Sequence, residues 1–212
     1  SLDGSLATYT PDANFNGNDS FTFSVTDADG EYSNAPVSIS VSAVNDAPVL
    51  APVSDVSFDE DGSGNTSLSG SDVDGDDLSY SITAGTDITA SLSGSDVSFS
   101  VPADYNGSES FTVAVTDGEY TDSQIISVTV IPVNDAPVLS SVGDKETNED
   151  VSLNFLLSAS DIEADVLTYS VTSGTNIVST LVGNDLTFTP NQDFNGSESF
   201  TVTVSDGELQ SS

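Results

Sequence analysis

Large apolar residues alternate with serine, threonine or alanine along the segments 21–25, 111–115 and 200–204. Successive side chains of a strand point to opposite faces of the sheet, so this period of two predicts strands with one buried face. Shorter alternating segments recur between them, and no stretch has the period of a helix. The pattern therefore predicts an all-β fold made of β-sandwiches.

The pentapeptide Asn-Asp-Ala-Pro-Val marks a repeat in this pattern. It occurs at 45–49 and at 134–138, each time after an alternating segment, and the offset is 134 − 45 = 89 residues. That length is close to the size of one β-sandwich domain. We expect tandem Greek-key sandwich repeats of about 89 residues: the C-terminal part of a repeat in 1–46, a complete repeat in 47–135, and a repeat lacking its last strand in 136–212.

Composition narrows the possible partners. The chain of 212 residues has 35 acidic side chains and one basic side chain, Lys145, which gives a formal net charge of −34. Nucleic acid is excluded because phosphate binding needs clustered Lys and Arg, and an anionic membrane surface would repel the protein. There is no Cys or His, and no apolar run approaches 18 residues, so we expect neither thiol chemistry nor direct membrane insertion. Cations are the expected partners.

Acidic groups recur at the same places in successive repeats and suggest a calcium protein. Ca²⁺ takes six to eight oxygen ligands, more than one such group supplies, but several groups at one end of a sandwich could supply them. Isolated acids such as Asp76 and Asp122 are expected to be plain surface residues. The recurring groups are Glu60 and Glu149; Asp72-Val-Asp74 and Asp161-Ile-Glu163; Asp117-Gly-Glu119, Asp206-Gly-Glu208 and Asp29-Gly-Glu31; and the pairs Asn45-Asp46 and Asn134-Asp135.

The segment Asp72-Val-Asp74 with the strand that follows it, and Asp117-Gly-Glu119, resemble motifs of extracellular cadherin repeats, in particular the cadherin-like tandem repeats of large bacterial surface adhesins. The resemblance covers essentially the whole chain. It implies an immunoglobulin-like or cadherin-like sandwich and calcium between consecutive repeats. One implied ligand set is Asp29, Glu31, Asn45, Asp46, Asp72 and Asp74; the other is Glu60, Asp117, Glu119, Asn134, Asp135, Asp161 and Glu163.

The joints also depart from the cadherin linker. The position two residues before the Asn is Ala43 or Pro132, where the cadherin linker has Asp, and the Asn that follows Asp in cadherins is missing. We therefore expect fewer ions in each joint than a cadherin linker holds, bound with a dissociation constant of about 10⁻⁴–10⁻³ M.

Three functions are compatible with these features. The leading hypothesis is a calcium-rigidified spacer in a long extracellular adhesin or filament, which extends a distal binding region for cell adhesion or biofilm formation and has neighbouring repeats as its partners. The alternatives are a calcium-dependent carbohydrate-binding module that uses Tyr32 or Tyr120 on cell-surface polysaccharide, and a filament subunit that exchanges strands with other subunits. An enzyme is not expected, because the acidic groups recur rather than forming one distinguished site.

Overall fold

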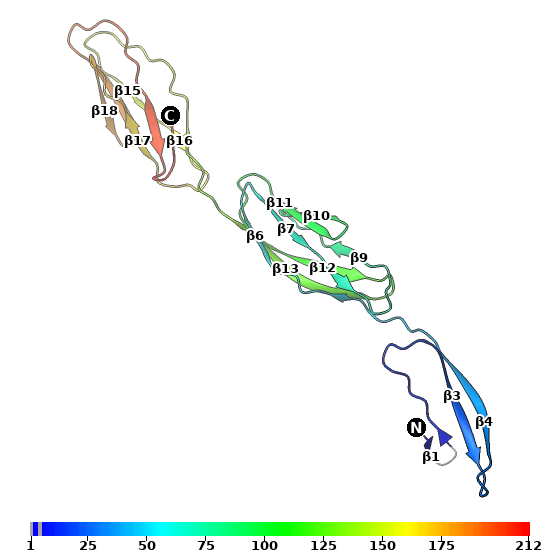
Figure 1. Ribbon diagram of the computed structural model, residues 1–212. Coiled ribbons are helices and arrows are strands. Elements are labelled where there is room, and N and C mark those ends of the chain that lie inside the picture. Colours follow the sequence, from blue (N-terminus) through cyan, green and yellow to red (C-terminus); the bar gives the residue numbers. More distant parts are fainter. Residues whose placement is uncertain (1, 4–5) are drawn as a thin grey trace. The chain divides into compact units, whose positions relative to one another are not determined.

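The structure, a computed structural model, describes residues 2–3 and 6–212 (Figure 1). The chain divides into two compact units, Ser1–Val130 and Ile131–Ser212, which are described separately below. No helix that is long and apolar enough to cross a bilayer occurs in the described residues.

The first unit contains a complete repeat, referred to here as the middle repeat. One sheet has the strand order β6-β13-β12-β9, the other has the order β10-β11-β7, and β5 pairs with β8 beside them. Its strands are β5 (Val49–Leu50), β6 (Val56–Asp59), β7 (Ser63–Ser67), β8 (Gly70–Ser71), β9 (Ser79–Ile82), β10 (Thr89–Ser93), β11 (Asp96–Ser100), β12 (Gly107–Thr116) and β13 (Thr121–Ile131).

The core of the middle repeat lies between these two sheets. Phe111, Val113 and Val115 of β12 are fully buried, whereas the residues between them are partly exposed, as the alternation predicts. Phe111 is paired with Ile126 of β13, and its ring lies 5.2 Å from the ring of Phe99 on the opposite sheet. Apolar side chains packed between the two sheets fix the positions of the ends of β12 and β13. The turns at those ends carry acidic groups.

The second unit, referred to here as the third repeat, repeats this layout. Its sheets have the orders β15-β19-β18 and β17-β20-β21, with β14 paired to β16. The aromatic rings of Phe155, Phe188 and Phe200 pack in a row, with centroids 5.9 Å and 4.4 Å apart. Its strands are β14 (Val138–Leu139), β15 (Leu153–Leu156), β16 (Ala159–Ser160), β17 (Thr168–Val171), β18 (Ile177–Val182), β19 (Asp185–Pro190), β20 (Val202–Ser205) and β21 (Gln210–Ser211).

The N-terminal part of the first unit is a long hairpin preceded by two short paired strands. β1 (Leu2–Asp3) pairs with β2 (Leu6–Ala7), and β3 (Gly17–Thr26) pairs over its full length with β4 (Tyr32–Val41). The apolar residues of β3, namely Phe21, Phe23 and Val25, are 39%, 47% and 57% exposed, whereas the matching residues of β12 are buried. The alternating pattern thus forms its strand here although the apolar face is only partly covered.

These observations confirm the prediction of all-β sandwich repeats. The predicted strand 111–115 lies inside β12 and 21–25 lies inside β3. Only part of 200–204 is a strand, because β20 begins at Val202.

Candidate calcium sites at the poles of the repeats

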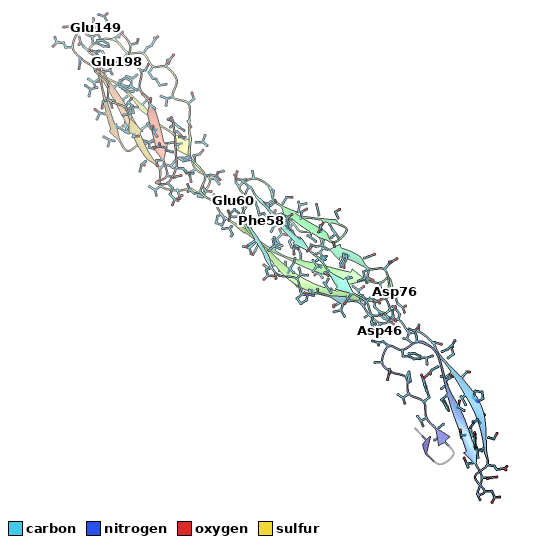
Figure 2. All side chains as sticks on the ribbon, viewed as in Figure 1. Asp46, Phe58, Glu60, Asp76, Glu149 and Glu198 are labelled. Carbon is cyan, nitrogen blue, oxygen red and sulfur yellow. The ribbon has the colours of Figure 1, made fainter. Side chains whose placement is uncertain are left out.

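Each repeat has two acidic ends. We call the end at which the chain enters a repeat its upstream pole and the opposite end its downstream pole. Figure 2 shows Asp46 and Asp76 at the upstream pole of the middle repeat and Glu60 at its downstream pole.

The upstream pole of the middle repeat gathers residues that are far apart in the sequence. Asn45 Nδ2 donates to Asp117 Oδ2 at 3.0 Å across 72 residues of sequence, and the N–H of Asp46 donates to Asp74 Oδ2 at 2.8 Å. Asp117 begins the turn between β12 and β13, and Asp74 follows β8. The joint, the Asp-x-Asp segment and the β12–β13 turn therefore meet at one end of a single repeat.

The Asp-x-Asp segment of the middle repeat forms a turn around its first carboxylate. Asp72 Oδ1 accepts the N–H groups of Asp74 at 2.8 Å and Gly75 at 3.1 Å, which fixes the side chain. One carboxylate oxygen from each of Asp72, Asp74 and Asp76 lies within 4.8 Å of the others. Asp72 Oδ2 is buried and has no hydrogen-bond partner among the described residues. The same is true of Asp161 Oδ2, at the equivalent position of the third repeat.

Buried oxygens of this kind fit a cation site. A buried carboxylate oxygen normally has a hydrogen-bond donor, and leaving it without one is costly. A water molecule or a hard cation would satisfy this oxygen, and the carboxylate oxygens around it are ligands that Ca²⁺ prefers. The donor set at the upstream pole therefore fits calcium.

The upstream pole of the third repeat has the same construction. Asn134 Nδ2 donates to Asp206 Oδ2 at 2.9 Å, and the N–H of Asp135 donates to Glu163 Oε2 at 3.4 Å. Both contacts lie within the second unit. Glu163 takes the place of Asp74 and accepts the same N–H group, over a longer distance.

Hydrogen bonds keep the turn carboxylates ionised. The N–H of Tyr120, together with the N–H of Glu119 and the amide of Asn45, holds the pKa of Asp117 below its usual range. Asn134 is the main cause of the lowered pKa of Asp206. Both groups are therefore charged, metal-competent carboxylates at neutral pH.

The downstream poles carry a second acidic set. In the middle repeat the N–H of Asp104 donates to Asp61 Oδ1 at 3.4 Å, and Glu60 precedes Asp61 directly after β6. In the third repeat the N–H of Asp193 donates to Asp150 Oδ1 at 3.0 Å. All four aspartates have left-handed backbones, with φ between 57° and 61°, a conformation that Asp tolerates better than most residues.

Two groupings predicted from the sequence are wrong. Asp117 and Glu119 were expected to join Asn134 and Asp135, but Asp117 binds Asn45 at the upstream pole of its own repeat. The ten residues of β12 put that turn about 30 Å from Gly107, which pairs with Val130 where the chain leaves the repeat.

Asp29 and Glu31 were expected to lie at the joint with Asn45. They lie instead in the turn between β3 and β4, at the end of that hairpin opposite to Val41, four residues before Asn45. The residue that accepts the turn N–H groups there, as Asp117 does in the middle repeat, is Asp27, at 3.0 Å from the N–H of Asp29 and 2.9 Å from that of Glu31. Two extra residues in this turn shift the Asp-Gly-Glu motif away from the equivalent position.

Sequence reasoning missed three further residues. Asp76, expected to be plain surface, belongs to the cluster with Asp72. Asp122, also expected to be surface, is half-buried, and its Oδ2 accepts the N–H of Leu50 at 2.8 Å. Asp104 was interpreted only as part of a turn, although its recurrence as Asp193 was the signal that could have identified the downstream pole.

The structure thus defines a class of protein: tandem β-sandwich repeats with acidic poles. The sequence matches the bacterial Ig domain family over residues 1–40, 45–129 and 134–212. The chain therefore belongs to this family of bacterial Ig domains. None of the curated proteins compared with it matches its sequence.

Solved structures show the same fold. PcdhgB3 EC1-4 is 11% identical, with a TM-score of 0.56 over 92% of this chain and 55% of that one. The protocadherin GammaB4 extracellular domain is 18% identical, with a TM-score of 0.52 over 94% of this chain and 37% of that one.

An endo-fucoidan hydrolase of glycoside hydrolase family 107, MfFcnA4, is 23% identical over 95% of this chain, with a TM-score of 0.35. The chain spans about a third of that enzyme's length, since 34% of it is covered. At these identities the neighbours with a TM-score above 0.5 show the cadherin-like sandwich and nothing more.

Proposed function

We propose that the chain is a calcium-rigidified, non-catalytic spacer segment of a longer extracellular protein, of the kind that holds an adhesive region away from a cell surface. Calcium at the upstream poles fixes the joint residues, Asn45-Asp46 and Asn134-Asp135, against the repeat that follows them. The partners of each repeat are thus the neighbouring repeats of the same chain, and calcium would stiffen the joints that connect them.

The observation that carries this proposal is the recurrence of one oxygen set in two successive repeats. In both, the first carboxylate of the acidic segment, Asp72 or Asp161, has a buried oxygen without a hydrogen-bond partner among the described residues. In both, the Asn of the joint donates to the Asp of the turn, Asp117 or Asp206. Construction of the same site twice favours a structural role over catalysis, which needs only one site.

Charge gives a physical reason for the ion. A net charge of −34 opposes a compact state, and the upstream pole of the middle repeat concentrates it by bringing carboxylate oxygens of Asp72, Asp74 and Asp76 within 4.8 Å of one another. A divalent cation bound among these carboxylates would turn their mutual repulsion into a net attraction. The proposed extracellular location and the expected affinity are consistent with each other, since millimolar free calcium outside cells would occupy sites with a dissociation constant of about 10⁻⁴–10⁻³ M.

Calorimetric titration with Ca²⁺, combined with small-angle scattering, tests this function. We expect saturable binding in the range of about 10⁻⁴–10⁻³ M and a narrower distribution of particle dimensions in calcium than in excess chelator. Mg²⁺ is the matched control ion, because it demands a tighter octahedral shell and binds flexible carboxylate sites weakly.

The double variant Asp72→Asn, Asp161→Asn is the matched protein control. It should lose binding at both upstream poles and show the same scattering with and without calcium. If calcium added to the wild-type chain gives no heat of binding and does not change the scattering, the proposal is wrong.

A further inference from the structure

A loop of the middle repeat surrounds one carboxylate with backbone N–H groups. Glu109 of β12 accepts the N–H of Thr86 at 2.8 Å, that of Asp87 at 2.7 Å and that of Ile88 at 3.2 Å. Successive N–H groups that converge in this way form the kind of concavity that binds external anions. Here the anion belongs to the protein.

The third repeat contains the same arrangement around Glu198, which Figure 2 labels. Its carboxylate accepts the N–H groups of Thr175 at 3.1 Å, Asn176 at 2.8 Å and Ile177 at 2.9 Å. The side-chain amide of Asn176 adds a fourth donor at 3.1 Å.

A glycine lets each loop close over its carboxylate. A Cβ on Gly85 would lie 2.5 Å from Glu109 Oε2 and 2.1 Å from the carbonyl oxygen of Ile88. A Cβ on Gly174 would lie 2.5 Å from Glu198 Oε2. The Gly and the Glu are 24 residues apart in both repeats (109 − 85 and 198 − 174).

The loop has a defined place in the fold. In the middle repeat it leads from β9, which pairs with β12, to β10, which belongs to the other sheet. Two further hydrogen bonds, both of 3.0 Å, tie Thr83 at the start of this crossover to Thr112 of β12. The carboxylate therefore fixes the connection between the two layers of the sandwich.

We propose that Glu109 and Glu198 are internal anions bound in anion-binding loops, that they latch the crossover in an acid-sensitive manner, and that each loop takes an external carboxylate when its own is removed. This device is independent of calcium. The loops are remote in sequence from the carboxylates of the upstream poles.

The effect of pH follows from the donors. The N–H groups of Asp87 and Thr86 hold the pKa of Glu109 below its ordinary value, and the N–H of Asn176 does so for Glu198. A carboxylate whose pKa is lowered by folding stabilises the fold above its unfolded pKa of about 4.3, and this stability is lost as pH falls through the folded pKa. The latches thus open in acid.

Neighbouring groups make Glu198 the cleaner test. Tyr105 is a titratable group close to both Glu109 and Asp87, and Asp87 itself contributes one of the N–H groups that bind Glu109. The corresponding positions around Glu198 are Asn176 and Phe194, which do not titrate.

Glu198→Ala and Glu198→Gln test the proposal in calcium-free buffer, with Glu146→Gln, an exposed Glu of the same repeat, as the control for charge removal. At pH 7 both Glu198 variants should unfold at lower urea concentration than the control. Amide exchange at Asn176 and Ile177 should rise roughly tenfold or more, as expected from losing a charge-assisted hydrogen bond. Sodium formate should restore the midpoint of Glu198→Ala, but not shift that of wild type or of Glu146→Gln beyond its general salt effect.

The difference in midpoint between wild type and Glu198→Gln should shrink as pH falls below about 4.3. Absence of formate rescue together with a pH-independent difference would overturn the proposal. If Glu198→Ala does not fold, Glu109→Ala in the larger core of the middle repeat provides the same comparison. Calcium titration of the same variants separates this outcome from the proposed function, since their calcium binding should match wild type in either case.

Discussion

The substitution Asp72→Asn should have opposite effects with and without calcium. Asn keeps the oxygen that accepts the N–H groups of Asp74 and Gly75, so the turn is retained. It removes the charge and replaces the buried, unpartnered Oδ2 with an amide that can donate to the adjacent carboxylates. Without calcium the change should be neutral or stabilising, and with calcium it should be destabilising.

The magnitudes follow from the geometry of the cluster. Two unit charges 4.8 Å apart repel by about 1 kcal/mol in bulk water and about 3.5 kcal/mol at an effective dielectric near 20. Because Asp74 and Asp76 are exposed, solvent screening favours the lower figure. Asp72→Asn should therefore stabilise the calcium-free repeat by about 1 kcal/mol, or about 4–8 °C in Tm for a repeat of this size.

In calcium the wild-type repeat should be more stable than the Asp72→Asn variant. At ~10 mM Ca²⁺, a dissociation constant of about 10⁻⁴–10⁻³ M stabilises the wild-type repeat by about 1.4–2.7 kcal/mol. The variant should lose most of that gain. Its Tm should thus lie above wild type in chelator and below wild type in calcium.

Differential scanning calorimetry in both buffers measures this crossing. Asp96→Asn, on the exposed side of β11, removes one charge outside the cluster and should change Tm by the same amount in chelator and in calcium. Asp161→Asn repeats the experiment in the third repeat and identifies which transition belongs to which repeat. The reasoning is refuted if Asp72→Asn lowers Tm equally in chelator and in calcium, or if the calcium response of its repeat is undiminished.

Five further substitutions, in three comparisons, test the fold. Ala164 has a left-handed backbone (φ 61°) where the middle repeat has Gly75 (φ 82°), so Ala164→Gly should stabilise and Gly75→Ala destabilise, each by about 1 kcal/mol in urea unfolding. Phe111→Ala should cost the middle repeat about 3–5 kcal/mol, because its ring is fully buried against Phe99, and Phe21→Ala in the exposed hairpin should cost much less. Gly85→Ala should lower the urea midpoint markedly, because its Cβ would meet the carbonyl of Ile88 at 2.1 Å, a backbone atom that cannot rotate away.

Periodicity was enough to predict the strands of the fold. Along β12 every second side chain is buried, so the alternation in 111–115 reports burial directly. The same alternation in β3 predicts the strand equally well, although its apolar face is partly exposed, because period reports strand geometry and not what covers the face. Burial of that face depends on a second sheet, which no local pattern encodes.

Most residues of the upstream poles could also be predicted, with Asp76 as an exception, but their grouping could not. Asp117 is 17 residues from Asn134 and 72 residues from Asn45, yet it is bonded to Asn45. The reason is strand direction: β12 runs from the downstream pole to the upstream pole, so the turn that ends it returns to where the chain entered. Sequence proximity favoured the wrong joint, because the direction of a strand within a repeat is set by topology and not by spacing.

Strand direction also determines what calcium would stabilise. The oxygens at each upstream pole come from the joint before a repeat and from two turns of that same repeat, so a bound ion would close a loop of more than 70 residues inside one repeat. An ion that binds only the folded repeat adds its binding energy to folding. Joint stiffness and repeat stability are then consequences of one event: the same contact orders Asn45-Asp46 or Asn134-Asp135 and holds the β12–β13 or β20–β21 turn. A variant that weakens calcium binding should therefore lower Tm in calcium and broaden the scattering distribution in proportion, whereas a purely local surface site would change neither.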